Sequence, residues 1–215
     1  MRNVLFIYAH MDDETILSYG TIKSFIENNY NVTLVTVCGY GRKDSDNLKR
    51  LTSYQNIIKE LGIKNIVLPY YDLNINENKC KNRLQQIIVD IKPDIVITHS
   101  CNDLHFEHRL LGEMSLVLCR NINDCTVKTL LHTQSNSGKL TFNKFGVYRP
   151  NYYIDISKYT DEKLKYLSTY TTELPIDRKD FRNPECIIFN NKDDGILFRV
   201  DSVESYEQIF RLEQW

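Results

Sequence analysis

Residues 4–14 read VLFIYAHMDDE, and this stretch decides the fold class. Its first six residues are apolar throughout, which is typical of a strand that is buried on both faces in a parallel sheet. The apolar run ends in His10, Asp12, Asp13 and Glu14. Ligands of open parallel sheets bind beyond the carboxyl ends of the strands. The stretch therefore predicts a buried first strand that carries a polar cluster to a candidate site.

The segments that follow alternate between short apolar runs and longer helical patterns. We predict further strands at 32–38, 66–70, 94–99 and 127–133, and helices near 14–28, 47–61, 78–91 and 107–120. Strand–helix alternation of this kind indicates an α/β fold in which helices cover both faces of a mainly parallel sheet. The expected architecture is a Rossmann-like three-layer arrangement.

The last third of the chain departs from this alternation. A strand is expected at 152–157, followed by a helix at 160–174 with Thr160 as its N-cap. The segments CIIF and ILFRV, separated by NNKDDG, predict a hairpin or a small extension within about 180–215. A length of 215 residues suits a single domain over 1–215.

Composition and charge limit the possible partners. The chain has 42% hydrophobic residues and a formal net charge of -1, so no strong field draws it to nucleic acid or to an anionic membrane. Its first apolar run is too short for a signal sequence, and no stretch approaches the ~20 apolar residues of a membrane span. Six cysteines without a C-x-x-C pair are expected to be free thiols. We therefore expect a cytoplasmic protein with neither nucleic-acid nor membrane partners.

The first polar cluster can supply part of a metal site. His10 and Asp13 are three residues apart, so on a turn that opens into a helix their side chains can point the same way. Asp12 then projects in another direction. Acidic residues at the start of a helix are also favoured by the helix dipole alone, so this cluster has a purely structural alternative.

A second cluster, HSCNDLHFEH (99–108), follows the fourth predicted strand. It places His105 and His108 three residues apart, and four of the five histidines of the chain fall in these two loops. The fifth, His132, is interpreted as structural because it lies in an apolar strand. A catalytic zinc takes three protein ligands and keeps one position open. The first cluster together with one histidine of the second would supply these ligands.

The two clusters resemble the motifs of a known family. AHMDDE (9–14) resembles the A-H-P-D-D-E motif of the PIG-L/LmbE-like zinc-dependent N-deacetylases, and HFEH (105–108) resembles their H-x-D-H motif. The helix from Arg50 to Gly62 and the lysine-bearing segment 152–170 resemble further family elements. This resemblance implies a hydrolase that removes the N-acetyl group from an amino sugar of the N-acetylglucosamine type and releases acetate and a free amine.

The resemblance also implies which residues bind the metal and which acts as the base. By this match the zinc ligands are His10, Asp13 and His108, and Asp12 is the general base that accepts the proton of the attacking water. An acetylated amino sugar is the implied small-molecule partner, and many members of the family form homo-oligomers.

Other residues receive supporting roles from the same resemblance. His105 matches the histidine that stabilises the oxyanion or protonates the leaving amine, and Glu107 matches its carboxylate partner. A nearby carboxylate favours imidazolium, so we expect Glu107 to keep His105 protonated at neutral pH. Arg50 matches an arginine that contacts substrate. Arg42, with Lys43 beside it, is expected to hold an anionic part of the substrate.

Three positions depart from the family pattern. Met11 replaces the proline of the first motif, and Glu107 replaces the aspartate of the second. Ser53 stands where the family often has a glutamate. None of the implied zinc ligands is lost, so the sequence predicts an active enzyme.

Alternative functions remain open from the residues alone. A Mg²⁺- or Mn²⁺-dependent sugar or phosphoryl transferase could use Asp12 and Asp13, although histidines favour zinc over these metals. A cysteine hydrolase built on Cys101 and His99 leaves the paired aspartates unexplained. A sugar-binding module is the non-enzymatic alternative. Dinucleotide binding is disfavoured because the first loop lacks G-x-G-x-x-G.

Overall fold

The computed structural model describes all residues except 43–46, 121–124, 136–145, 175, 178–180 and 214–215. The strands are β1 (Asn3–Tyr8), β2 (Asn31–Thr36), β3 (Lys64–Val67), β4 (Ile95–His99), β5 (Thr129–Thr133), β6 (Tyr152–Asp155) and β7 (Val203–Arg211). The helices are α1 (Asp13–Glu27), α2 (Leu48–Leu61), α3 (Glu77–Ile91), α4 (Phe106–Leu118), α5 (Thr160–Leu167) and α6 (Pro184–Ile196), with a 3-10 turn at Ser157–Tyr159.

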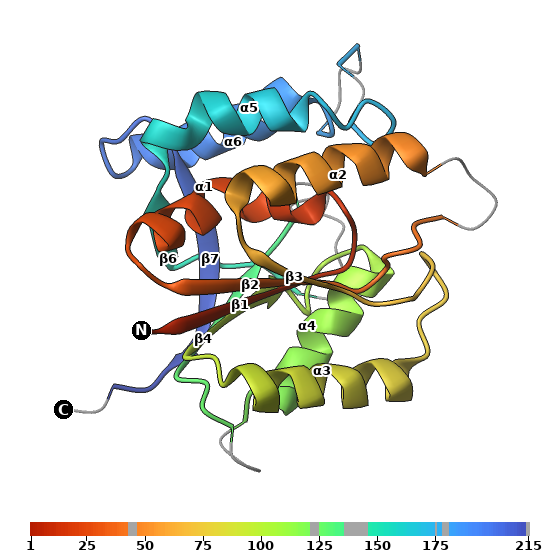
Figure 1. The fold of residues 1–215 in the computed structure, drawn as a ribbon. Coiled ribbons are helices and arrows are strands. Elements are labelled where there is room, and N and C mark those ends of the chain that lie inside the picture. The colour runs from red at the N-terminus through yellow and green to blue at the C-terminus, as the bar shows by residue number, and fades with distance from the viewer. Residues whose placement is uncertain (43–46, 121–124, 136–145, 175, 178–180, 214–215) are drawn as a thin grey trace.

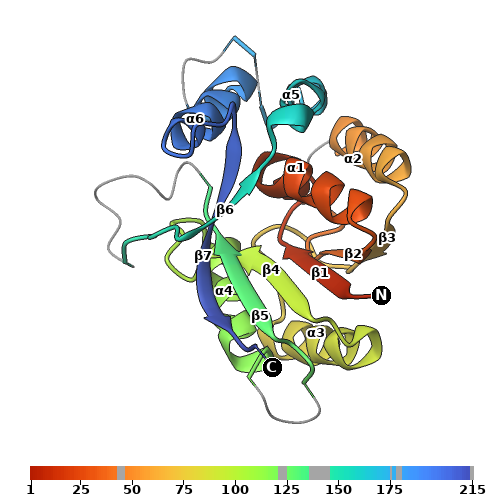
Figure 2. The ribbon, with the colours of Figure 1, turned by 90° about the vertical axis from the view of Figure 1, so that its left-hand side faces the viewer.

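The strands form one sheet in the order β3-β2-β1-β4-β5-β7-β6. The first five strands run parallel, and β7 lies antiparallel to both of its neighbours, β5 and β6. Helices α1, α2, α5 and α6 lie on one side of the sheet and α3 and α4 on the other (Figures 1 and 2). The predicted three-layer α/β fold with a mainly parallel sheet is confirmed.

The apolar run of β1 is buried on both faces of the sheet. Val4, Phe6 and Tyr8 belong to the core beneath α1 and α2, whereas Leu5 and Ile7 belong to the core that packs against α3 and α4. None of these five side chains is more than 3% exposed. Alternate residues of a strand face opposite sides of a sheet, so a continuous apolar run is required here.

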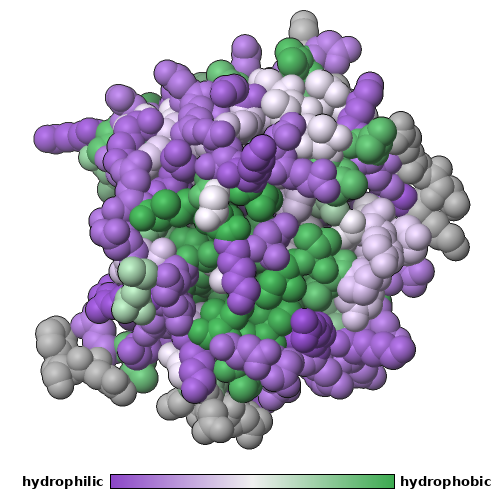
Figure 3. All heavy atoms as spheres, viewed as in Figure 1, coloured by the Kyte–Doolittle hydropathy of each residue, from purple (hydrophilic) through white to green (hydrophobic). Residues whose placement is uncertain are grey.

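Strand β3 forms an open edge of the sheet. Ile66 within the strand and Ile63 just before it are half-buried, and Val67 at its end is 45% exposed. Figure 3 shows a hydrophobic area on this face, between α2 above and α3 below.

The predicted C-terminal hairpin is wrong. CIIF lies inside helix α6, and residues 203–211 form strand β7, which inserts between β5 and β6. The helix begins where Asn183 accepts a hydrogen bond from Glu185 N (2.8 Å) and Pro184 occupies the first turn. This combination is a helix-start signal that outweighs the turn character of NNKDDG. Helix α5 is also shorter than the expected 160–174, and Tyr159, not Thr160, is its N-cap.

A buried ion pair joins the C-terminal elements to α1. Helix α1 breaks its helical conformation at Ser18, and the N–H groups of Gly20 and Thr21 after the break donate to the carboxylate of Glu204 on β7. Lys163 of α5 donates to the same carboxylate at 2.7 Å, and both side chains are at most 1% exposed. Because α1 starts at the polar cluster, this network helps to fix the orientation of the candidate site.

Candidate metal centre and active site

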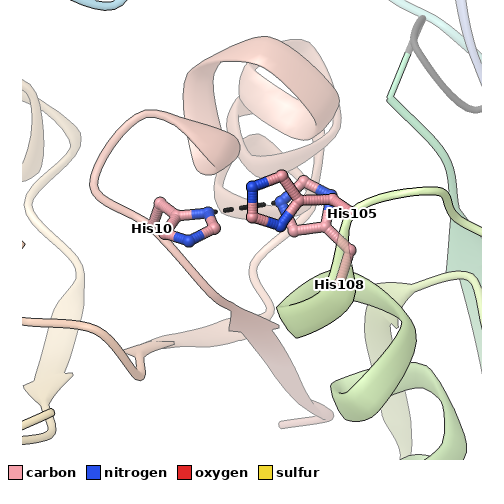
Figure 4. A group of neighbouring side chains, drawn as sticks. All are labelled: His10, His105 and His108. Carbon is pink, nitrogen blue, oxygen red and sulfur yellow. Dashed lines mark hydrogen bonds between the residues drawn. The ribbon is translucent and has the colours of Figure 1, made fainter. Parts of the chain in front are cut away.

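The polar clusters meet in one cavity of about 750 Å³ at the carboxyl ends of the parallel strands. The loop after β1 contributes His10 and Asp12, the start of α1 contributes Asp13, and the start of α4 contributes His108 with the preceding His105. Figure 4 shows the three histidine rings gathered at this point, although almost a hundred residues separate the two segments. Parallel pairing of β1 with β4 brings their loops together.

Three of these side chains present donor atoms at the spacing that a tetrahedral ion requires. His10 Nδ1 lies 3.3 Å from His108 Nε2 and 3.3 Å from Asp13 Oδ2, and His108 Nε2 lies 3.4 Å from Asp13 Oδ1. The ligands of a tetrahedral zinc with bonds of about 2.0–2.1 Å are themselves about 3.3 Å apart. The residues present therefore fit a zinc ion, with two imidazoles and one carboxylate.

Neighbouring donors overlap with this set. Within the part of the chain that the structure describes, His10 also groups with His105 and His108 and with Cys38 and Asp72, and Asp13 groups with His99 and His108. Asp12 groups with His10 and Asp13, so its carboxylate lies close to theirs and does not project away from them as predicted. His99 accepts a hydrogen bond from Ala9 N at 3.0 Å, is fully buried and stacks on His108. His99 therefore packs against the face of the His108 ring and helps to fix its orientation.

The charge balance of the centre favours a cation. Burial acts to lower the pKa of His10, but hydrogen bonding to Asp13 and Glu107 outweighs it and raises that pKa to about 9. For His108, Asp13 and Asp103 likewise outweigh burial and raise the pKa to about 10. Both shifts show that neighbouring carboxylates surround the two imidazoles with negative charge; a metal ion binding here would displace these protons, because a metal binds the neutral imidazole.

Two buried carboxylates lie at the outer nitrogens of the candidate ligand histidines. Glu107 Oε2 lies 3.4 Å from His10 Nε2, and Asp103 Oδ2 lies 3.3 Å from His108 Nδ1. Ligand histidines usually give their second N–H to such a carboxylate, which fixes the ring and raises its basicity. No role was predicted for Asp103. Its position two residues before His105 was the only available signal.

The carboxylate of Asp12 is held by an arginine. Arg50 Nη2 donates to Asp12 Oδ1 at 3.0 Å, and Arg50 Nη1 donates to Asp72 Oδ2 at 3.3 Å. Glu173 Oε1 lies 4.0 Å from Arg50 Nε. Asp12 precedes α1, but its side chain makes no capping hydrogen bond to the helix. The structural alternative for this aspartate, a helix start, therefore does not explain its contacts.

Arg50 lines the cavity, as expected for a substrate contact, but it is only 4% exposed. Sequence reasoning missed Asp72 and Glu173, which lie in the loop after β3 and beyond α5. Neither is part of a recognisable motif, so only the fold relates them to Arg50. Arg42 also lines the cavity, whereas Lys43 lies outside the described residues.

The predicted protonation of His105 is wrong. Its imidazole contacts Glu107 (Nδ1 to Oε2, 3.3 Å). However, burial and the positive charges of His108 and His10 lower its pKa to about 4, against the opposing effect of the carboxylates. A bound divalent cation would add further positive charge. Both effects favour the neutral imidazole of His105.

The structure also describes the surroundings of four other polar or apolar residues from the two motifs and the nearby strands. Glu14, in the first turn of α1, is fully buried and accepts a hydrogen bond from Tyr170 Oη at 2.7 Å, and burial raises its pKa to about 8. Met11 is only 4% exposed and packs into the hydrophobic core, so an apolar residue suits this position. His132 is buried against Ser115 (2.8 Å), as its structural interpretation expects. Burial raises the pKa of the Cys101 thiol, which argues against a cysteine hydrolase.

Comparison with known proteins identifies the family. A profile of PIG-L, described as GlcNAc-PI de-N-acetylase, matches residues 5–119, more than half of the chain. The chain belongs to the PIG-L family. The matched residues include the three donors of the candidate metal centre and Asp12, whereas residues 120–215, Glu173 among them, lie outside the match.

Solved structures share the PIG-L fold of this chain. The N,N'-diacetylchitobiose deacetylase from Pyrococcus horikoshii has a TM-score of 0.77 at 19% identity, covering 97% of this chain and 84% of its own. The zinc-inhibited form of teicoplanin deacetylase Orf2 has a TM-score of 0.76 at 12% identity, covering 99% and 100%.

A third structure of the same fold carries a different activity. GalB from Pseudomonas putida, a 4-carboxy-2-hydroxymuconate hydratase, has a TM-score of 0.75 at 13% identity, covering 100% and 99%. At such identities the likeness concerns the fold alone, and the hydratase illustrates that a fold does not decide a reaction. No helix among the described residues has both the length and the apolar character needed to cross a membrane.

Proposed function

We propose that this PIG-L family protein is a zinc-dependent N-deacetylase that hydrolyses the N-acetyl group of an amino sugar of the N-acetylglucosamine type. The observation that carries the proposal is the placement of Asp12 beside the donors His10, Asp13 and His108 in one cavity. Two imidazoles and a carboxylate favour zinc over Mg²⁺ or Mn²⁺, which prefer oxygen ligands. The substrate is a small molecule that enters this cavity.

Asp12 is the group best placed to move protons. A zinc ion held by the three donors would lower the pKa of water and polarise the amide carbonyl. Asp12 accepts a proton from the attacking water as the C–O bond forms, while Arg50 holds one of its oxygens. Asp12 then returns this proton to the amide nitrogen as the C–N bond breaks. The hydroxyl of the water thus becomes part of acetate, and its proton is transferred to the free amine.

His105 has a different role from the one that its motif implies. A neutral imidazole is a far weaker acid than imidazolium, so Asp12 acts as both base and acid in this proposal. His105 remains beside the reacting group through its contact with Glu107. We propose that it contributes to the polar wall next to the carbonyl oxygen.

The proposal is tested by measuring acetate release from N-acetylglucosamine and its glycosides with zinc-loaded protein. Asp12→Asn is expected to retain zinc and lose most turnover, and Asp13→Ala is expected to lose zinc. Release from none of these compounds by the wild type would favour a binding module. Activity that requires Mg²⁺ or Mn²⁺ in protein containing no zinc would favour the transferase alternative. Full turnover in Asp12→Asn would exclude this residue as the base.

A further inference from the structure

The cavity has an apolar lining that the proposed reaction does not use. Six apolar side chains line it beside the metal-binding group: Ile16, Leu73, Leu104, Leu174, Phe181 and Ile187. A volume of about 750 Å³ falls within the range of pockets that hold drug-sized ligands, and is more than one N-acetylated sugar ring fills. The cavity therefore has room for a group attached to the sugar.

This lining extends from the interior of the protein to the mouth of the cavity. Leu174 and Ile187 are 2% and 4% exposed, whereas Phe181 and Leu73 are 42% and 76% exposed. Apolar side chains exposed around a concave site mark a surface that binds an apolar partner. The buried members belong to the hydrophobic core, so this surface is backed by rigid packing.

The apolar surface begins beside the groups suited to the sugar ring. Leu73 follows Asp72, and Leu174 follows Glu173, the two carboxylates that flank Arg50. Asp72 and Glu173 both line the cavity, so their carboxylates lie beside the start of the apolar surface. A ring placed there would extend its attached group over the neighbouring leucines.

We propose that the apolar lining binds an aromatic or alkyl aglycone, so that the substrate is an N-acetylated amino sugar with an apolar group attached to the ring. The inference rests on the proposed deacetylase function and names its substrate class. Leu174, Phe181 and Ile187 lie outside residues 5–119, the part of the chain that matches the family, so family membership does not dictate this surface.

The experiment compares kcat/KM for acetate release from the methyl and phenyl glycosides of N-acetylglucosamine. We expect the phenyl glycoside to be favoured at least about tenfold, mainly through a lower KM, because the ring leaves water for an apolar surface. Phe181→Ala is expected to reduce this phenyl-to-methyl ratio several-fold. Phe189→Ala is the matched control: this side chain is 67% exposed on α6 and does not line the cavity, so the ratio should stay the same.

The other outcomes separate this inference from the proposed function. Equal kcat/KM values for the two glycosides would overturn the aglycone site while leaving the deacetylase function in place. A preference for an N-octanoyl over an N-acetyl methyl glycoside, without a phenyl effect, would assign the lining to the acyl chain and overturn the inference. No acetate from any glycoside would overturn the proposed function, and the aglycone site with it.

Discussion

Arg50 Nη2 lies 3.0 Å from Asp12 Oδ1, and both side chains are buried. The arginine comes from the first turn of α2 and the aspartate from the loop before α1. Asp72 and Glu173 surround the same guanidinium, so three carboxylates fix its position. Arg50 therefore orients the proposed base in addition to lining the cavity.

Replacing Arg50 by lysine should impair turnover more than metal binding. A lysine carries a point charge and cannot contact Asp12, Asp72 and Glu173 at once, so the Asp12 carboxylate loses its fixed position. We expect kcat to fall on the order of tenfold to hundredfold while zinc content is retained. Steady-state kinetics and metal analysis check this, with Arg83→Lys on the exposed face of α3 as control. A raised KM with normal kcat would show instead that Arg50 contributes only to substrate binding.

Asp103 should control the affinity for zinc without being a ligand. Its carboxylate holds His108 Nδ1 at 3.3 Å and is itself bound by Ser135 N and Oγ. Removing the charge in Asp103→Asn is expected to weaken zinc binding about 10- to 100-fold, as is usual for carboxylates behind a ligand histidine. Competition with a chelator measures the change, and Asp90→Asn on the surface of α3 is the control. Unaltered affinity would show that Asp103 has only a structural role.

The buried pair Lys163–Glu204 should dominate the stability of the C-terminal elements. Lys163→Met leaves the Glu204 carboxylate buried without its cation, which typically costs about 3–5 kcal/mol in the free energy of unfolding. Lys165→Met, an exposed change on the same helix, is expected to cost much less. Denaturant unfolding measures both variants. Adding Glu204→Gln to Lys163→Met should recover part of the loss, and a double variant no more stable than the single one would contradict this account.

His132 should make the protein less stable in acid. Burial lowers its pKa to about 4 in the folded protein, against about 6.5 in an unfolded chain. Between these values only the unfolded state takes up the proton, so the stabilisation is complete above about pH 6.5 and is lost as the pH falls towards 4.

The effect of His132 amounts to about 3 kcal/mol across this window. In His132→Gln the dependence of the unfolding free energy on pH should therefore be shallower by that amount between pH 4 and 6.5. The other histidines are common to both proteins, so the difference belongs to this residue. Equal slopes in the two proteins would place the acid sensitivity elsewhere.

The sequence by itself determined the architecture and the location of the site. An apolar run that is buried on both faces requires a sheet covered on both sides, and parallel strands end at one edge. The clusters after β1 and β4 therefore had to meet, and the spacing of His10 to Asp13 and of His105 to His108 placed the candidate metal ligands at two helix starts. These are local patterns, which depend on neighbouring residues only.

Tertiary structure alone decided which groups surround those ligands. Asp72 and Glu173 are far from Arg50 in the sequence but lie beside its guanidinium. Strand β7, near the C-terminus of the chain, pairs between β5 and β6. The charge of His105 also depends on the fold, because burial and two neighbouring imidazoles override the nearby Glu107. Desolvation and contacts between distant segments are properties of the packed molecule, and no local pattern of residues records them.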